Sequence, residues 1–493
     1  MNTSTWIART VSSLLPDAER KKKAESAAPP AAPDGPASSP AAGKTVPERS
    51  IAERLDATLP RKGEAMAPRT LRRTLESLKA IVDPGIGEVE GGRLAGAVIK
   101  SYAAMSPEQR RDVWLLMSER FVADPKQVKQ AQARFSAAVG TPDEAAAEVL
   151  YRRATVSPRR RLLQRFSADP AGIRFLVDLR AEMLVHLKAD RRLRALDVEM
   201  EYMFSTWFDT GFLELRRISW DSPASLVEKL IRYEAVHDVR GWDDMKNRLD
   251  SDRRCYAFFH PRLEGEPLIF VEVALLDHMA SEVMPLLDVS AGNVDLNKVN
   301  TAIFYSISNT QAGLKGVSFG DSLIKRVVEA LHDEFPRLKT YATLSPIPGL
   351  RPWLLRNAAR LLELTPPKER EQLAQALQVE DLQAQHLLAD LDRVHELDAR
   401  SPRRKWLLRA ASQYLASEWQ DGKPVDAVAR FHLGNGARVE RINWAADLSP
   451  RGLRQSCGMM VNYLYDLKRL DKHRAALAAG TVPASRTISS QHF

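Results

Sequence analysis

A glycine-rich loop at residues 309–322 carries the side chains best suited to hold an anion. It reads NTQAGLKGVSFGDS and lies between AIFYSIS, an expected strand, and LIKRVVEAL, an expected helix. Gly313, Gly316 and Gly320 allow tight turns and a close approach of the backbone to a ligand. Free N–H groups before a helix start, with Lys315 and Lys325 nearby, predict a phosphate site. An ordinary strand-to-helix turn explains the same glycines, and neither the Walker pattern nor GxGxxG is present.

A serine follows the next expected strand. This strand, Lys339–Leu344, is followed by Ser345-Pro346-Ile347-Pro348-Gly349. The two prolines have no backbone N–H to donate, so this segment cannot form the regular hydrogen bonds of a β-ladder. The Ser345 hydroxyl is therefore expected at a strand end beside the anion loop. A plain turn remains the alternative for a lone Ser-Pro. His432, in FHLGNG, is the other candidate, and taken alone it reads equally as a core or turn histidine.

The elements that position these residues fall into a helical part and a mixed part. In residues 50–205 the apolar side chains have helical spacing throughout, and Ser106 is a predicted N-cap before Pro107. Two apolar stripes illustrate this spacing: Val113, Leu116, Met117 and Phe121, and further on Leu176, Leu179, Met183 and Leu187. Beyond Trp220, strands are expected at Cys255–His260, Pro267–Leu276, Ala302–Ser308, Lys339–Leu344 and Val439–Trp444, with a helix at Leu323–Leu331, helices from Pro352 to Trp419 and a final helix.

The predicted organisation has four segments. Residues 1–49 form a tail and linker rich in Ala, Pro, Gly and Ser, which cannot bury enough surface to order. Residues 50–205 form a helical bundle, residues 206–475 a catalytic domain with a mixed sheet, and residues 476–493 a C-terminal tail. Ser-Pro-Arg-Arg occurs at Ser157–Arg160 and again at Ser401–Arg404. Helix starts with a solvated basic first turn explain both better than phosphate contact does.

Several of these stretches together resemble the malonyl-CoA decarboxylase family. The resemblance is carried by SISNTQAGLKGVSFGDSLIKRVVEALHDEFPRLKTYATLSPIPGL and by FHLGNGARVERINWAADLSPRGLRQSCGMMVNYLYDL, and it covers residues 200–470 most strongly. It implies an α+β fold: an N-terminal all-α helical bundle followed by a GNAT-like (acyl-CoA N-acyltransferase-like) mixed-sheet catalytic domain. It also implies a homotetramer built by the helical domains as a dimer of dimers.

The same resemblance implies the activity and the site. The reaction is decarboxylation of malonyl-CoA to acetyl-CoA through an enolate, with Ser345 as proton acceptor and His432 as proton donor. The coenzyme A contacts implied are Lys315, Gly316, Val317, Ser318, Phe319, Gly320, Asp321 and Ile324. Lys315 and Ser318 depart from the general GNAT pattern Q/R-x-x-G-x-G/A. Tyr463 and Tyr465 fall near the family's active-site tyrosine, although helix packing explains them as well, and His237, His260 and His278 are expected to be structural.

Composition leaves the choice of partner open. The chain has 493 residues, a net charge of +9 and 27% charged residues, which suits a polyanionic partner of any kind. Besides a decarboxylase, an acyltransferase and a basic helical protein that binds nucleic acid are considered. The latter needs a clustered basic face with stacking aromatics, and the Arg pairs are scattered.

Metals, membranes and targeting signals are not expected. Two cysteines, Cys255 and Cys457, make no disulfide framework, and no cluster has metal-ligand spacing. The proposed substrate contains coenzyme A, so no separate cofactor is expected. No long apolar stretch spans a membrane. The positive cluster follows the N-terminal apolar stretch and SSQHF is no peroxisomal signal, so a cytoplasmic location is expected.

Overall fold

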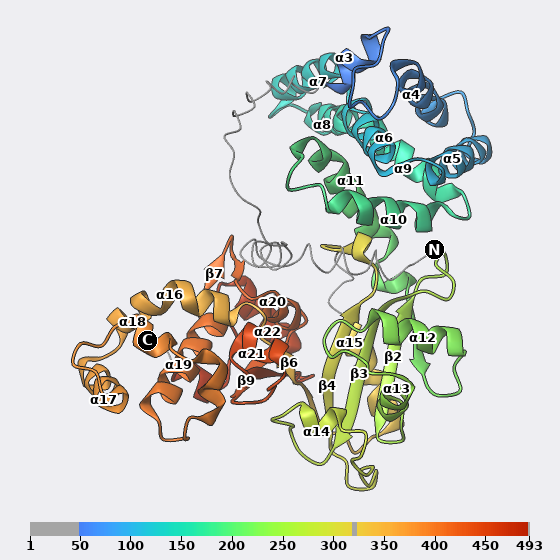
Figure 1. The fold of residues 1–493 in the computed structure, drawn as a ribbon. Helices are drawn as coiled ribbons and strands as arrows, with labels where there is room; N and C mark the ends of the chain where they lie inside the picture. Colours follow the sequence, from blue (N-terminus) through green and yellow to red (C-terminus); the bar gives the residue numbers. More distant parts are fainter. Residues whose placement is uncertain (1–48, 318–322, 492–493) are drawn as a thin grey trace, which may run out of the picture. The chain divides into compact units, whose positions relative to one another are not determined.

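The computed structural model describes residues 49–317 and 323–491. Its contacts divide the chain into two compact units that meet in the sequence between Met203 and Phe204. Figure 1 shows helices alone in the first unit and a sheet with surrounding helices in the second. Among the described residues, no helix is long and apolar enough to cross a membrane.

The first unit is a helical bundle. Its described helices are α3 (Ile51–Asp56), α4 (Pro68–Val82), α5 (Glu88–Ala103), α6 (Pro107–Glu119), α7 (Pro125–Ala138), α8 (Glu144–Thr155), α9 (Pro158–Ala168), α10 (Gly172–Leu184) and α11 (Arg194–Trp207). The predicted N-cap at Ser106 is confirmed, as part of a capping box with Gln109, and the first stripe is buried; its last member, Phe121, lies two residues beyond the end of α6. The second stripe holds only to Met183, because α10 ends at Leu184 and Leu187 lies beyond it.

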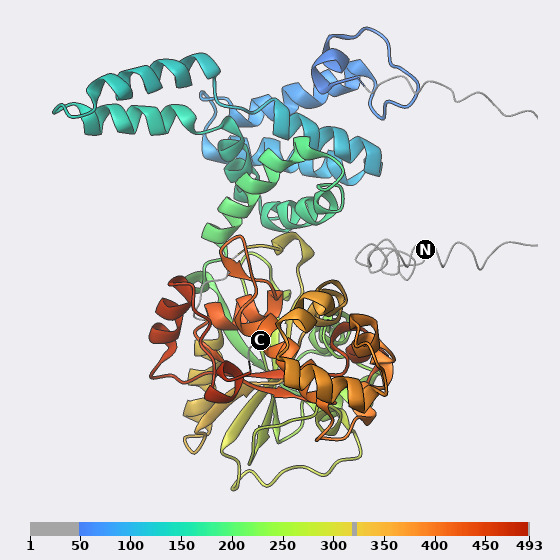
Figure 2. The ribbon, with the colours of Figure 1, turned by 90° about the vertical axis from the view of Figure 1, so that its left-hand side faces the viewer.

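Two helices of this unit bury very little. In α7 no residue is buried, and in α8 only Ala147 is. The two helices pack against each other as a hairpin that projects from the rest of the bundle (Figure 2). Val139, Val149 and Leu150 are all roughly half exposed on it. A hairpin of this kind has little intrinsic stability, because most helical stability comes from burying an apolar face.

The two Ser-Pro-Arg-Arg segments do begin helices, but their first turns are not fully solvated as predicted. Arg159 and Arg403, each directly after the helix-opening proline, are 5% and 8% exposed. Arg159 donates to the carbonyl oxygens of Met117 and Ser118, and Arg403 to those of Leu387 and Ala389. A buried guanidinium with several donors can satisfy backbone carbonyls that nothing else reaches, which the spacing of charges alone does not reveal.

The second unit is built on an eight-stranded mixed sheet. The strands are β1 (Glu214–Ile218), β2 (Arg253–Phe259), β3 (Pro267–Leu276), β4 (Thr301–Asn309), β5 (Thr340–Thr343), β6 (Ser345–Pro346), β9 (Arg438–Asn443) and β10 (Met460–Leu464). Their order is β1-β2-β3-β4-β5-β10-β6, with β9 also paired to β10. Among these described strands, β4 and β5 form the one parallel pair. They are connected through α15 (Leu323–Glu334), which is the predicted strand-loop-helix-strand unit.

The parallel pair parts halfway along β4. Its register runs from Thr301 opposite Thr340 to Phe304 opposite Thr343, and the Leu344 N–H donates to the Phe304 carbonyl. Directly after Phe304, the register of β4 with β3 shifts, which leaves Tyr305 as an extra residue. A bulge of this kind bends a strand and ends regular pairing. Beyond the bulge, β4 pairs only with β3, whereas the chain that continues from β5 into β6 pairs with β10. Strand β4 and this continuation of β5 therefore diverge.

Helices cover both faces of the sheet. On one face, Val227 and Leu230 of α12 (Ala224–Tyr233) and Met245 of α13 (Trp242–Arg248) share a buried cluster with Cys255 and Phe259. On the other face, Arg254 of β2 pairs with Glu334 of α15, and Arg326 of α15 lies over the Phe258 ring. The prediction of a helical bundle followed by a mixed-sheet domain is confirmed.

Three features of this unit differ from the prediction. Strand β1 precedes Trp220, where we expected the sheet to begin. Met460–Leu464, expected within a final helix, is the interior strand β10. The expected C-terminal tail is folded: Ala484 bridges Val439 of β9, and Ile488 of α23 (Arg486–Ser489) is 1% exposed.

The region between β6 and β9 is largely helical, as predicted. It contains α16 (Leu350–Leu364), α17 (Pro367–Leu377), α18 (Ala384–Leu388), α19 (Pro402–Ala416), the short hairpin β7 (Trp419–Gln420) and β8 (Lys423–Pro424), and α20 (Ala427–Gly434). After β9 come α21 (Pro450–Ser456), β10 and α22 (Leu470–Ala478). Helix α20 is the element that carries His432.

Candidate active site

Ser345 and His432 lie side by side, although 87 residues separate them. The Ser345 Oγ is 3.1 Å from the His432 Nε2, and the His432 Nδ1 is 2.8 Å from the Tyr465 hydroxyl. Ser345 begins β6, His432 lies in the last turn of α20, and Tyr465 directly follows β10. Ser345, His432 and Tyr465 are 5%, 3% and 3% exposed.

The neighbouring groups favour one tautomer of His432. The Ser345 hydroxyl donates to the Thr343 Oγ1, which also accepts the Tyr463 N–H. With its proton used in this way, Ser345 accepts a bond from a protonated Nε2, and the Nδ1 accepts from the Tyr465 hydroxyl. A chain of hydrogen bonds thus runs from Tyr465 through His432 and Ser345 to Thr343.

Burial keeps this cluster uncharged. Desolvation lowers the pKa of His432 to about 3, and no carboxylate of the described residues opposes this shift. Desolvation also raises the pKa of Tyr465 well above its ordinary value, so its hydroxyl stays protonated. The Tyr463 ring stacks on the imidazole, with centroids 4.6 Å apart and planes 26° apart. A neutral imidazole in a dry site responds strongly to any charge that arrives beside it.

Helix α20 is fixed at both ends. At its start, the buried Asp426 carboxylate caps the Val428 and Ala429 N–H groups and accepts the Tyr414 hydroxyl. Burial raises the pKa of Asp426, and the two backbone bonds oppose that rise. At its end, Gly436 has a φ of +85°, and a Cβ there would lie 2.8 Å from the Leu470 carbonyl oxygen. Only glycine fits this close approach.

Strand β10 holds the serine side of the site. Val461 is paired with Ser345, and Asn462, fully buried in the same strand, donates to the carbonyl oxygens of Thr343 and Ala280. The Asn462 Oδ1 accepts from Asn443 and Arg441. This side chain therefore uses its donor and acceptor atoms to fix the junction between β5 and β6, where the chain turns at Ser345.

A cleft of about 560 Å³ lies beside the predicted anion loop. Lys315, Gly316 and Val317, three of the predicted coenzyme A contacts, line it together with the end of β4 and, from α20, Arg430 and Phe431. The φ of Gly316 is +84°, a conformation that favours glycine. Ser318, Phe319, Gly320 and Asp321 lie outside the described residues. Ile324 is 1% exposed and faces the interior, and its neighbour Leu323 lines the cleft instead.

The Ser345–His432 pair does not itself line this cleft. Phe431 does, and its ring contacts the His432 ring edge-on, with centroids 5.1 Å apart. Lys315 and Arg430 bring positive charge to the cleft wall. The cleft can thus hold an anionic ligand, and Phe431 is the part of its wall that contacts the imidazole.

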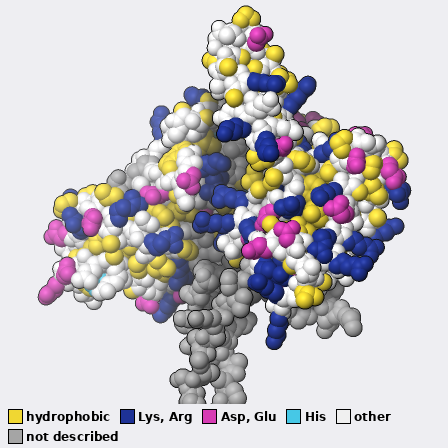
Figure 3. Space-filling view, turned by 90° about the horizontal axis from the view of Figure 1, so that it is seen from above, with side chains coloured by type: hydrophobic (Ala, Val, Ile, Leu, Met, Phe, Trp, Pro, Cys, Tyr) yellow, Lys and Arg dark blue, Asp and Glu magenta, His cyan; other side chains and the backbone are white. Residues whose placement is uncertain are grey.

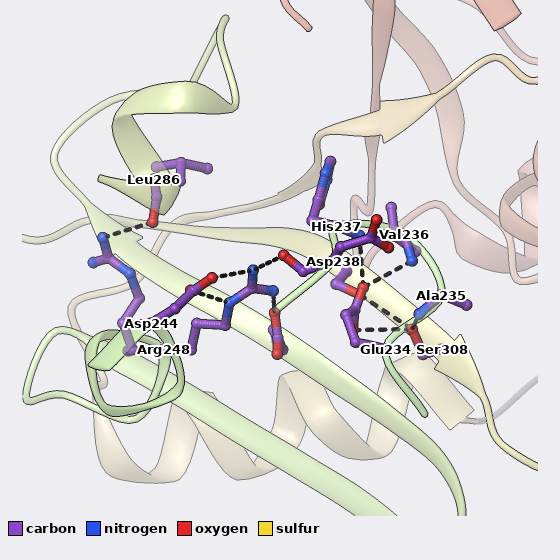
Figure 4. A network of polar contacts seen from close by, with 12 residues as sticks. Glu234, Ala235, Val236, His237, Asp238, Asp244, Arg248, Leu286 and Ser308 are labelled. Carbon is purple, nitrogen blue, oxygen red and sulfur yellow. Dashed lines mark hydrogen bonds and ion pairs between the residues drawn. The ribbon is translucent and has the colours of Figure 1, made fainter. Parts of the chain in front are cut away.

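A polar network ties the free half of β4 to the loop after α12 (Figure 4). The Glu234 carboxylate accepts the hydroxyls of Ser306 and Ser308 and the N–H groups of Val236 and His237. Beside it, burial raises the pKa of Glu272 to about 8, with the nearby Glu234 charge acting in the same direction and Arg248 opposing it. The half of β4 that leaves β5 is therefore braced by side chains.

The three histidines expected to be structural have local partners. His260 lies between the Trp207 carbonyl and the Arg262 N–H, and His278 is exposed beside Asp277. His237 is buried, which lowers its pKa, and its N–H bonds Glu234. In the described ranges, no group of three His, Cys, Asp or Glu side chains could hold a metal ion.

Sequence patterns did not single out two contributors to the site, and a third was predicted in the wrong kind of element. Thr343 and Arg430 carry no motif of their own. Tyr465 was noted but was placed in a helix, where its hydroxyl had no predicted partner. The alternation in MVNYLYDL, with Val461, Tyr463 and Tyr465 two residues apart, was the available signal for a strand.

Comparisons with known proteins match nearly all of the second unit. A family model described as malonyl-CoA decarboxylase C-terminal domain matches residues 211–492, and one described as malonyl-CoA decarboxylase N-terminal domain matches residues 121–208. Mitochondrial malonyl-CoA decarboxylase of Anser anser anser is 39% identical over 350 residues, 68% of this chain and 69% of that protein. The Rattus norvegicus protein is 35% identical over 411 residues, 78% of this chain and 81% of that protein.

Solved structures agree with these relatives. Malonyl-CoA decarboxylase from Rhodopseudomonas palustris is 37% identical with a TM-score of 0.73, covering 85% of this chain and 99% of that one. Malonyl-CoA decarboxylase from Cupriavidus metallidurans is 42% identical with a TM-score of 0.69, covering 86% and 100%.

Proposed function

The chain belongs to the malonyl-CoA decarboxylase family, and we propose that it converts malonyl-CoA to acetyl-CoA and carbon dioxide. The observation that supports this most directly is the buried contact of Ser345 with His432, close to a cleft lined by the anion loop. Two residues far apart in the sequence meet just beyond the point where strand β4 leaves β5, and Phe431, the neighbour of His432, lines the cleft.

The proposed binding mode uses the charge of the cleft. Coenzyme A carries its phosphates at one end and the thioester at the other. Lys315, Arg430 and the backbone at Gly316 suit the phosphates, because free N–H groups and cations bind anions together. The acyl end then passes Phe431 to reach His432. The contacts at Ser318, Phe319, Gly320 and Asp321 stay part of this proposal.

The proposed chemistry begins with loss of the carboxylate. The bond between the α-carbon and the carboxylate breaks, carbon dioxide leaves, and the electron pair moves into the thioester carbonyl to form an enolate. The thioester is itself the electron sink, so we propose no metal or further cofactor. Hydrogen bonds from Ser345 and His432 would hold the carboxylate out of the thioester plane, and backbone N–H groups near the diverging strands would stabilise the enolate oxygen.

A proton must then reach the α-carbon. Burial keeps His432 neutral, but an arriving malonyl carboxylate places a negative charge in a buried space, which raises the pKa of the imidazole. Nε2 already carries a proton in this tautomer, so the proton taken up with the substrate goes to Nδ1, where the Tyr465 hydroxyl turns to accept it, and the Nε2 proton becomes available to the enolate carbon. Ser345 receives the Nε2 hydrogen bond beforehand and thereby fixes its direction.

An incubation without any acceptor tests the proposed activity. Purified protein with malonyl-CoA alone should release carbon dioxide and acetyl-CoA in equal amounts. An acyltransferase needs an amine acceptor, so malonyl-CoA that stays intact until an amine is added would favour that rival. A nucleic-acid protein is not favoured, since Lys and Arg are spread over the visible face with Asp and Glu among them (Figure 3).

We also propose that the helical unit joins chains into a tetramer, a dimer of dimers. The projecting α7–α8 hairpin supports this, because Val149 and Leu150 are 47% and 48% exposed on helices that bury almost nothing. A cytoplasmic location is part of the same proposal.

A further inference from the structure

A second cleft, in the helical unit, is lined by four arginines. It has a volume of about 800 Å³ and lies between α9 and the segment that joins α4 to α5. The arginines are Arg153, Arg160, Arg161 and Arg165, and the one acidic residue on its wall is Glu88. The proposed decarboxylase reaction uses none of them.

Arg165 is the most buried of the four. It is 8% exposed, and its Nη2 donates to the Ile86 carbonyl. Its Nη1 has no hydrogen-bond partner within the described part of the chain. The side chain is held by α5, because a Cβ at Gly91 would lie only 2.9 Å from the Arg165 Cδ. A buried cationic N–H without an acceptor is costly, and an anion in the cleft would supply the acceptor.

Two more arginines lack a carboxylate partner. Arg161 makes one long bond of 3.5 Å to the Asp83 carbonyl, and Arg153 is exposed at the end of α8. Neither forms an ion pair with any described residue, whereas Arg160 is paired with Glu199. Even with Glu88 counted against them, Arg153, Arg161 and Arg165 leave the cleft positively charged.

Two helix N-termini add to this charge. Helix α9 has 11 residues and begins at the cleft wall with Ser157 as its N-cap, and α5 has 16 residues and begins there at Glu88. The Ser157 hydroxyl bonds Glu199 instead of capping its helix, and the N-cap of α5 is Gly87, which has no side chain. The first N–H groups of both helices are therefore without side-chain acceptors, as at helix ends that bind anions.

We propose that this cleft binds a small phosphate-bearing anion. Phosphate offers more acceptor oxygens than a carboxylate, so it can engage several guanidinium groups at once. The volume suits a ligand up to the size of a nucleotide. The Ser157–Arg160 segment is thus both a helix start and part of a binding wall.

Calorimetric titration of the full-length protein with pyrophosphate, repeated with ADP, tests the proposal. Arg153→Gln with Arg161→Gln removes two cations that contribute little to packing, and it should weaken pyrophosphate binding at least about tenfold. Lys315→Gln, in the other unit, separates this site from the proposed coenzyme A cleft and should leave the helical site intact. Arg134→Gln on α7, also exposed and unpaired among the described residues, is the matched control.

The outcomes are distinct. The site is supported if the wild type binds pyrophosphate saturably and the Arg153/Arg161 double variant loses this binding. Lys315→Gln and Arg134→Gln should both keep it. Tighter binding of ADP than of pyrophosphate would identify a nucleotide as the preferred ligand. No saturable binding by the wild type, equal binding by the double variant, or loss only in Lys315→Gln would overturn the proposal without bearing on decarboxylation.

Discussion

The Tyr465 hydroxyl donates to the Nδ1 of His432 and thereby favours the tautomer in which Nε2 carries the proton and donates to Ser345. Tyr465→Phe removes that hydroxyl and leaves a buried Nδ1 without its partner. We expect kcat to fall about tenfold, in line with a hydrogen bond of about 1–1.5 kcal/mol, while the KM for malonyl-CoA changes little.

Tyr463→Phe is the matched control for this prediction. The two tyrosines lie two residues apart, but the Tyr463 hydroxyl has no partner among the described residues, and its ring alone stacks on His432. Its removal should leave kcat nearly unchanged. If both variants behave alike in steady-state kinetics, the Tyr465 hydroxyl has no positioning role.

The lowered pKa of His432 gives a prediction for how its charge depends on pH. With a pKa of about 3, its imidazole stays neutral down to pH 5. An NMR titration, with the His432 signal identified by its absence in His432→Gln, should show no change of that signal between pH 8 and about 5. A midpoint near 6.5, the ordinary value for histidine, would show that the site is wetter than the structure has it.

The lowered pKa of His432 also predicts how the stability of the fold changes with acid. In the unfolded chain His432 takes up a proton below about pH 6.5, whereas in the fold it does not, so the unfolded state binds more protons. Stability therefore falls as the pH drops below 6.5, by up to about 1.4 kcal/mol per pH unit for this group. Thermal unfolding of the wild type should accordingly show a steeper loss of Tm from pH 6.5 to 5 than that of His432→Gln.

Single residues were predicted more easily than their partners. Ser345 and His432 are followed by residues that mark turns, Pro-Ile-Pro-Gly and Gly-Asn-Gly respectively, and the resemblance to malonyl-CoA decarboxylases drew attention to both. Their contact is a property of the fold, because 87 residues lie between them. The direction of the hydrogen bonds needed Thr343 and Tyr465, whose side chains have no signature until the strands are assembled.

At the scale of elements, the end of α20 positions His432. The Ala437 N–H bonds the His432 carbonyl, and Gly436 makes that turn possible with its positive φ. Gly436→Ala adds a strained φ and a methyl group 2.8 Å from the Leu470 carbonyl oxygen. We expect a loss of stability of about 1–3 kcal/mol and a fall in kcat, measured by thermal unfolding and steady-state kinetics.

Gly434→Ala is the control for the end of this helix. A Cβ there meets nothing within 4 Å, and the residue is the last of the helix and has no positive φ, so Ala is tolerated. Its stability should be equal to the wild type or higher. A similar loss in both variants would mean that α20 tolerates no change at all, and that the Gly436 turn is not special.

Strand β10 shows why a short, mostly apolar segment is hard to assign. The apolar content of Met459, Met460, Val461, Tyr463 and Leu464 suits a buried strand and a buried helix, and only the two-residue spacing noted above favours a strand. Its position inside the sheet, between β5 and β6, is set by pairing with strands that precede it by more than a hundred residues. In contrast, β3 has the bounds predicted from its apolar run and its flanking turn.

At the scale of the whole molecule, the exposed hairpin α7–α8 gives the prediction for assembly. Light scattering on the purified wild type should give the mass of four chains. Leu150→Asp places a charge on the proposed interface and should lower that mass, with Lys62→Asp, exposed and outside the hairpin, as the control. A monomeric wild type would contradict the assembly, whereas an unchanged tetramer in Leu150→Asp would place the interface elsewhere.

The central claim concerns one pair of side chains and one reaction. Ser345→Ala and His432→Ala should each lower kcat for malonyl-CoA decarboxylation by about 10²–10³, the usual effect of losing a donor at a developing negative charge. Because the phosphates bind elsewhere, acetyl-CoA affinity measured by calorimetry should stay within about threefold of the wild type. Near-normal turnover in either variant, with the fold intact, would contradict the account.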